Sequence, residues 1–168
     1  AYKLLTRYRD KVLCFNDDIQ GTASVAVAGV LASTRITKKK VADLKIMFLG
    51  AGSAATGIAD LIAFAMKKAG LEDSVAFSRL FFVDINGLVI KSRKDLMPHN
   101  LPYAHDLKPM NFVQAIKELK PDILIGATGA AGAFSKEVIE AMSAINERPV
   151  IFALSNPTSK AECTAEQA

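Results

Sequence analysis

Hydrophobic residues gather in short runs along the chain, and most of these runs lead into a glycine or a polar residue. The four clearest runs are residues 44–49, 80–83, 122–125 and 149–154. Short, mostly apolar runs of this length are typical of strands that are buried on both faces of a parallel sheet. The pattern therefore predicts four buried strands, and the weaker run 88–90 is expected to extend the sheet after a turn at Asn86 and Gly87.

Segments with helical spacing of apolar residues separate these runs. After Gly50, one stripe falls at positions i, i+3, i+4, i+7 and i+8: Ile58, Leu61, Ile62, Ala65 and Met66. Gly70 suits the end of that helix, because glycine readily adopts the left-handed conformation found there. Further helices are predicted over residues 19–34, 112–119 and 135–145. Thr164 and Gln167 resemble a capping box that opens one more helix.

Strands that alternate with helices over the whole length predict an α/β fold. We expect one domain over residues 1–168, of the Rossmann type, with a doubly wound, mostly parallel sheet and helices on both faces. Ligands of such sheets bind beyond the carboxyl ends of the strands. The loops that follow the predicted strands should therefore line one crevice; they span residues 50–55, 84–87, 126–132 and 155–157.

Two segments carry weaker signals. Residues 71–78 are interpreted as an extension before the second strand. Residues 99–108 are polar and have prolines at or near their edges, so a surface loop is expected there. His99 and His105 lie in that loop, and we expect them to be surface residues rather than catalytic bases.

A glycine-rich turn is the first candidate binding site. The residues Gly50, Ala51, Gly52, Ser53, Ala54 and Ala55 match the pattern G-x-G-x-x-G/A between a strand and an amphipathic helix. In that pattern the first glycine permits the turn, the second admits a pyrophosphate, and the small last residue allows close packing of helix on strand. The exposed amides at the helix start then bind phosphates. A purely structural turn is the alternative.

Asp84, at the end of the second predicted strand, is placed to bind the ribose of a dinucleotide. A simple turn-forming aspartate remains the alternative. Its carboxylate also repels a 2′-phosphate, which favours NAD over NADP unless a cation compensates, and the candidate cations are Lys91, Arg93 and Lys94. We expect NAD as the cofactor, with NADP as the second candidate.

Acidic and amide residues near other loops add further candidates. Asp17 and Asp18 precede the first long helix, where they either cap it or contribute two oxygen ligands to a divalent cation. Asn156 either binds a nicotinamide or a substrate carboxylate, or forms a turn with Pro157. The glycines of residues 126–132 either bring backbone close to a cofactor or form an ordinary loop.

Composition excludes several function classes. The 51% apolar and 23% charged residues fit a folded globular protein, and the net charge of +4 is scattered, so no nucleic acid partner is expected. The two cysteines form no C-x-x-C pattern, which fits an intracellular, reducing compartment. No apolar stretch is long enough to span a bilayer, so no membrane association is expected.

Three segments, read in order, give a more specific indication. Residues 15–23 (FNDDIQGTA), 50–52 (GAG) and 151–158 (IFALSNPT) together resemble malic enzymes, and the likeness extends over essentially the whole chain to residues 161–167. The resemblance implies NAD or NADP and Mg²⁺ or Mn²⁺ as cofactors. It implies malate as the substrate and pyruvate and carbon dioxide as products.

The resemblance also implies roles for individual residues. Asp18 matches a metal ligand, Asp17 a carboxylate that pairs with a catalytic lysine, and Asn156 a residue that contacts substrate and nicotinamide. The remaining implied cofactor contacts are Thr22, Gly50, Ala51, Gly52, Ser53, Ala54, Ala55, Asp84, Thr128 and Gly129. Asn100 and Leu101 stand where NADP-preferring relatives tend to have lysine, which again favours NAD.

Other residues that the family needs have no match here, among them its catalytic tyrosine and lysine, a substrate arginine and two further metal ligands. We therefore expect a fragment of a longer multidomain enzyme, inactive alone, that acts in the mitochondrial matrix or cytoplasm as a homo-oligomer. The missing initial methionine and the end inside a capping box favour this. A free-standing dinucleotide-binding or regulatory module is the alternative, and an amino-acid dehydrogenase explains the sheet but not residues 15–23 or 151–158.

Overall fold

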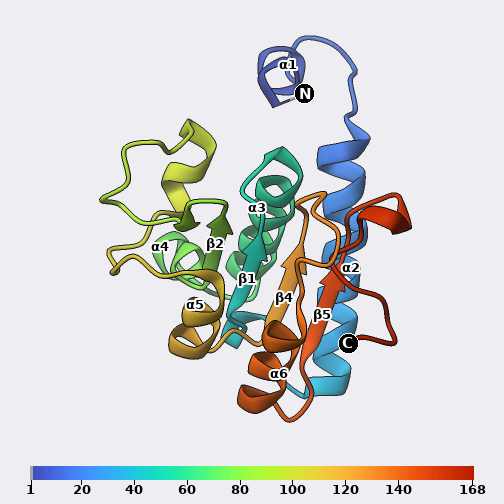
Figure 1. Cartoon of the computed structure of the whole chain (residues 1–168). Coiled ribbons are helices and arrows are strands. Elements are labelled where there is room, and N and C mark those ends of the chain that lie inside the picture. Colours follow the sequence, from blue (N-terminus) through green and yellow to red (C-terminus); the bar gives the residue numbers. More distant parts are fainter. Residues whose placement is uncertain (1) are drawn as a thin grey trace.

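A five-stranded sheet forms the centre of the fold (Figure 1). The computed structural model describes residues 2–168, and its strands are β1 (Ile46–Leu49), β2 (Leu80–Asp84), β3 (Gly87–Leu88), β4 (Ile123–Gly126) and β5 (Val150–Ala153). The strand order is β3-β2-β1-β4-β5. The four longer strands are parallel, and β3 pairs antiparallel with β2. This confirms the predicted mostly parallel sheet and its extension after β2, although the turn lies at residues 85 and 86 and the added strand already includes Gly87.

Helices cover both faces of the sheet (Figure 1). The α-helices are α1 (Tyr2–Tyr8), α2 (Thr22–Thr37), α3 (Ser53–Lys68), α4 (Asp73–Ser78), α5 (Phe112–Leu119) and α6 (Lys136–Ile145). Residues of α2, α3 and α4 share one buried cluster with one face of the sheet, whereas α5 and α6 pack on the other. Within the described part of the chain, no helix is long and apolar enough to cross a membrane.

The alternation of side chains along β1 builds these two cores. Ile46 and Phe48 face the α2–α3 layer, Met47 faces the α5–α6 layer, and all three are fully buried. Phe48 stacks on Phe82 of the neighbouring strand, with ring centroids 4.7 Å apart. Each side chain of this size contributes roughly 1.5–3 kcal/mol when it is fully buried. The central strands therefore form a rigid platform beneath the loops at their carboxyl ends.

Two helical segments differ from the sequence prediction. The predicted helix over residues 19–34 begins instead with a π-helix, η1 (Asp17–Gly21), and continues as α2 to Thr37. Residues 71–78, interpreted as an extension, contain the short helix α4. Its six residues give too short a pattern for an amphipathic stripe, and its buried Ala76 provides only a weak apolar signal.

The expected surface loop at residues 99–108 is wrong for its first half. Residues Pro98–Tyr103 form a 3-10 helix, η3, in which Asn100 and Tyr103 are buried. The Tyr103 ring packs against Phe77 and Phe82, with centroid distances of 5.2 and 4.8 Å, and its hydroxyl donates to Asp60. These tertiary contacts outweigh the local effect of the prolines.

The last residues form the predicted capping box but not a helix. The Thr164 amide donates to Gln167 Oε1 at 2.9 Å, and the Gln167 amide donates back to Thr164 Oγ1 at 3.3 Å. Residues 165–167 form a turn.

Candidate site at the carboxyl ends of the strands

The glycine-rich turn joins β1 to α3 and leaves its backbone open. Gly50 has φ +107°, and a Cβ atom there would lie 2.5 Å from the Ala127 carbonyl oxygen, so glycine is required by both conformation and space. Gly52 is exposed at the N-cap of α3, and no atom lies within 4 Å of where its Cβ would be. A ligand can therefore approach the backbone at Gly52.

The start of α3 supplies hydrogen-bond donors beside that opening. The Thr56 amide makes the first intrahelical bond, 3.0 Å to the Gly52 carbonyl oxygen. The amides of the preceding residues Ser53, Ala54 and Ala55 lack intrahelical acceptors, as at every helix start. Ala55 itself is fully buried, which matches the close packing predicted from its small size. This arrangement is suited to phosphate binding.

The segment η3 holds the glycine turn from one side. Asn100 Nδ2 donates to the Ala51 carbonyl oxygen at 2.8 Å, and His99 Nε2 lies 3.2 Å from the same oxygen. His105 Nε2 donates to the Leu80 carbonyl oxygen at 2.8 Å, since a carbonyl only accepts. The expectation that both histidines are plain surface residues is therefore wrong, because each is half-buried and bonded to backbone.

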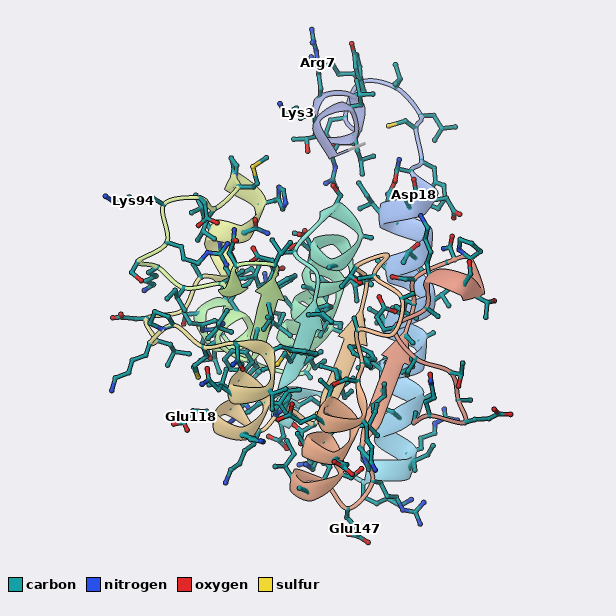
Figure 2. The ribbon with its side chains drawn as sticks, viewed as in Figure 1. Lys3, Arg7, Asp18, Lys94, Glu118 and Glu147 are labelled. Carbon is teal, nitrogen blue, oxygen red and sulfur yellow. The ribbon has the colours of Figure 1, made fainter. Side chains whose placement is uncertain are left out.

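Asp84 ends β2 next to the glycine turn and is held by one of the three candidate cations. Arg93 donates from Nη1 to Asp84 Oδ1 at 2.9 Å and from Nη2 to Oδ2 at 2.8 Å, and also bonds Asp95. Figure 2 shows Lys94 directed away from the body of the fold. The two carboxylates raise the pKa of Arg93, and the Arg93 guanidinium holds the pKa of Asp95 well below its usual range. The Asp84 charge is thus compensated within the protein.

A buried carboxylate ties together the loops after β4 and β5. The Glu162 side chain is fully buried and accepts hydrogen bonds from the amides of Thr128 (3.0 Å) and Ser155 (3.2 Å). It also accepts from both hydroxyls of these residues. Sequence reasoning missed Glu162, because no local spacing links it to residues 7 and 34 positions earlier.

The two predicted contacts in the β4–α6 loop are exposed, but their amides are already used. The amides of Thr128 and Gly129 donate to Ser155 Oγ at 3.0 and 2.8 Å. Asn156 follows Ser155, is exposed, and is joined to Pro157 by a cis peptide bond. The structure thus brings Thr128, Gly129 and Asn156 together around the hydrogen-bonded Ser155 side chain. Both interpretations of Asn156, as a turn residue and as a binding residue, are compatible with this arrangement.

Asp17 and Asp18 open the π-helix η1 with exposed side chains. The cap is made by Asn16, whose Oδ1 accepts from the Ile19 amide at 2.9 Å. The capping role considered for the two aspartates therefore falls to their neighbour. Among the described residues, no group of three or more His, Cys, Asp or Glu side chains is arranged to hold a metal ion. The two carboxylates fit part of a divalent-cation site at most, since such a site needs about six ligands.

A cavity of about 320 Å³ connects this acidic segment to the end of β5. It is lined by Asp17, Gly21, Thr22, Val25, Ala26 and Leu154. A larger cavity of about 660 Å³ is lined by residues such as Arg35, Asp122 and Arg148 and contains none of the predicted site residues. Figure 2 shows Asp18 in the upper part of the view, below Arg7 and Lys3, and Glu147, which lines the larger cavity, at the bottom.

Comparison with known proteins identifies the family. Residues 19–168 match the family model described as "Malic enzyme, NAD binding domain". An NADP-dependent malic enzyme of Anas platyrhynchos is 53% identical over 99% of this chain and 30% of its own length. A mitochondrial NAD-dependent malic enzyme of Ascaris suum is also 53% identical, over 100% of this chain and 26% of its own length. The chain thus spans less than a third of these relatives.

A solved structure agrees with the sequence comparison. The malic enzyme of Entamoeba histolytica superposes with a TM-score of 0.77 at 25% identity, over 99% of this chain and 33% of that chain. The NAD-dependent malic enzyme of Thermotoga maritima shares the fold, with a TM-score of 0.79. Both the predicted resemblance and the Rossmann-type fold are therefore confirmed, against the amino-acid dehydrogenase alternative. This chain belongs to the malic enzyme family, and residues 19–168 are its NAD-binding domain.

Proposed function

We propose that the chain binds a nicotinamide dinucleotide across the carboxyl ends of β2, β1, β4 and β5. The observation that carries this proposal is the open backbone at Gly52 beside the amides of Ser53, Ala54 and Ala55, which lack intrahelical acceptors. The pyrophosphate lies on this turn, and the adenosine ribose lies toward Asp84. The nicotinamide then extends across the switch between β1 and β4 toward Thr128, Gly129 and Asn156.

The same proposal assigns the complete enzyme the oxidative decarboxylation of malate to pyruvate and carbon dioxide. A bound nicotinamide supplies a hydride acceptor. Within this chain, Asn156 orients the nicotinamide and the substrate carboxylate, and Thr22 lies beside them in the 320 Å³ cavity. The exposed Asp17 pairs with a cationic group from outside the chain, and Asp18 contributes one carboxylate toward Mg²⁺ or Mn²⁺.

Titration calorimetry of the purified chain with NAD and NADP, with and without Mn²⁺, tests this assignment. We expect saturable binding of a dinucleotide without Mn²⁺, because the phosphate and ribose contacts come from this chain alone. Mn²⁺ is expected to change the affinity little, since the described residues hold only part of a cation site. A folded chain that binds neither dinucleotide would contradict the proposal.

A further inference from the structure

Glu162 is a charged side chain that is buried in the fold without an ion pair among residues 2–168. Its exposed fraction is 0%, and within the described part of the chain no Lys, Arg or His forms a salt bridge with it. Its four hydrogen-bond partners are all donors, two amides and two hydroxyls, from Thr128 and Ser155. A carboxylate, which only accepts, satisfies this pattern, and a carboxamide of the same shape does not.

The backbone around Glu162 is built to admit this side chain. A Cβ atom at Gly126, the last residue of β4, would lie 2.5 Å from Glu162 Cδ, so the carboxylate packs directly on the strand end. The Phe134 amide donates to the Glu162 carbonyl oxygen at 3.0 Å, and the Gly132 amide to that of Ala161 at 3.1 Å. The backbone of residues 161 and 162 is therefore bonded to the β4–α6 loop, while the Glu162 side chain bonds Ser155 after β5.

The bonds of Glu162 set the spacing between two loops of the proposed dinucleotide site. Ser155 donates its hydroxyl to Glu162 and accepts the amides of Thr128 and Gly129, so the loop after β4 cannot move without the turn after β5. Asn156 is the next residue along that turn. In a doubly wound sheet the strand pair on this side of the switch receives the half of the dinucleotide opposite to the adenosine.

We infer that Glu162 is a positioning residue, which fixes the turn carrying Asn156 against the nicotinamide half of the cofactor. This inference rests on the proposed function. Among the described residues, the side-chain hydrogen bonds of Glu162 go to Thr128 and Ser155. None goes to the glycine turn or to Asp84, which are proposed to hold the pyrophosphate and the adenosine ribose. Loss of the carboxylate therefore weakens binding of the nicotinamide half and leaves binding of the ADP-ribose half unchanged.

The variant Glu162→Gln tests the inference, with NADH and ADP-ribose as the two probes. Glu166→Gln is the matched control, because Glu166 is exposed in the same segment. We expect Glu162→Gln to raise the Kd for NADH about ten-fold, comparable to one charge-assisted hydrogen bond, while the Kd for ADP-ribose stays within about two-fold. The NADH measurement uses the fluorescence of the bound nicotinamide, and the ADP-ribose measurement uses calorimetry.

A purely structural role of Glu162 predicts that Glu162→Gln weakens the binding of NADH and ADP-ribose equally. That result would overturn the inference, and so would unchanged binding of both ligands. If Glu162→Gln does not fold, Ser155→Ala is the second variant, because it removes one hydroxyl donor to Glu162 and leaves the carboxylate in place. A selective loss of NADH binding in Ser155→Ala would support the inference, and an equal loss of both ligands would overturn it. A wild-type chain that binds neither probe contradicts the proposed function itself. A wild-type chain that binds ADP-ribose as tightly as NADH contradicts only the inference.

Discussion

Arg93 holds the carboxylate of Asp84 in a two-pronged contact, with Nη1–Oδ1 and Nη2–Oδ2 distances of 2.9 and 2.8 Å. The exposed fractions of the two side chains are 12% and 24%, so the pair is shielded from water better than an ordinary surface ion pair. The pair stands where the ribose of the adenosine is proposed to bind. The repulsion that Asp84 alone would exert on a 2′-phosphate is therefore reduced.

The first prediction concerns this pair and the choice between NAD and NADP. Arg93→Ala leaves Asp84 uncompensated, so we expect the Kd for NADP to rise about ten-fold more than the Kd for NAD. Calorimetry with both dinucleotides measures the ratio, and Lys94→Ala is the control because Lys94 is exposed and directed outward (Figure 2). An unchanged NAD-to-NADP ratio in Arg93→Ala would show that the arginine does not compensate Asp84 at the 2′ position.

A second prediction separates two neighbouring residues that were both expected to set cofactor preference. Asn100 is 5% exposed and donates to Ala51, whereas Leu101 is 60% exposed. Asn100→Lys buries a charge and removes a hydrogen bond, so we expect it to lower the free energy of unfolding by about 3 kcal/mol. Leu101→Lys is expected to change it by less than about 0.5 kcal/mol. Urea unfolding measures both, and equal stability of the two variants would contradict the burial of Asn100.

The third prediction concerns the stability of the fold at mildly acidic pH. Burial lowers the pKa of His105 below its usual value near 6.5, and Lys91 acts in the same direction. The imidazole also packs on Phe81, with ring centroids 4.6 Å apart. The unfolded chain binds this proton more readily than the folded chain. The stability that the neutral, buried His105 contributes is therefore complete above pH 6.5, and it is lost as the pH falls through the lower pKa of the folded state.

We therefore expect the free energy of unfolding to decrease as the pH falls below about 6.5. His105→Gln removes the titrating group and should flatten this part of the pH profile, whatever it does to stability at neutral pH. Chemical unfolding at a series of pH values measures the slope. A wild-type profile that is flat there, or one that keeps its slope in His105→Gln, would show that His105 is not the group responsible.

The sequence predicted the elements whose signals are local. The run of residues 80–83 and the stripe from Ile58 to Met66 depend on nearby spacing, and both form β2 and α3 as expected. The predicted helix over residues 112–119 agrees with α5 at both ends, and Asn111 and Gln114 form a capping box at its N-terminus. A helical stripe follows from burial of one helix face, and a short apolar run bounded by turn residues follows from burial of a strand on both faces.

The features that were missed depend on residues far apart in the chain. Tyr103 becomes buried because Phe77 and Phe82 pack on its ring, and Asn100 is buried where its side chain donates to the Ala51 carbonyl oxygen. No sequence window contains these partners. Among the site residues, the glycine turn was predicted from its spacing, whereas the pairing of Asp84 with Arg93 was only one of three alternatives.

The most direct test of the account compares Gly52→Glu with the wild-type chain in a calorimetric titration with NAD. No atom lies within 4 Å of the Cβ position at Gly52, so the added side chain has room and the fold should remain intact. Its bulk and negative charge stand where the pyrophosphate is proposed to bind, and we expect the affinity to fall at least about 100-fold. Ser143→Glu, on an exposed position of α6, adds the same side chain elsewhere and should bind NAD like the wild type. Loss of binding in Gly52→Glu alone would support the assignment of the turn; unchanged binding of NAD by a folded Gly52→Glu chain would contradict it.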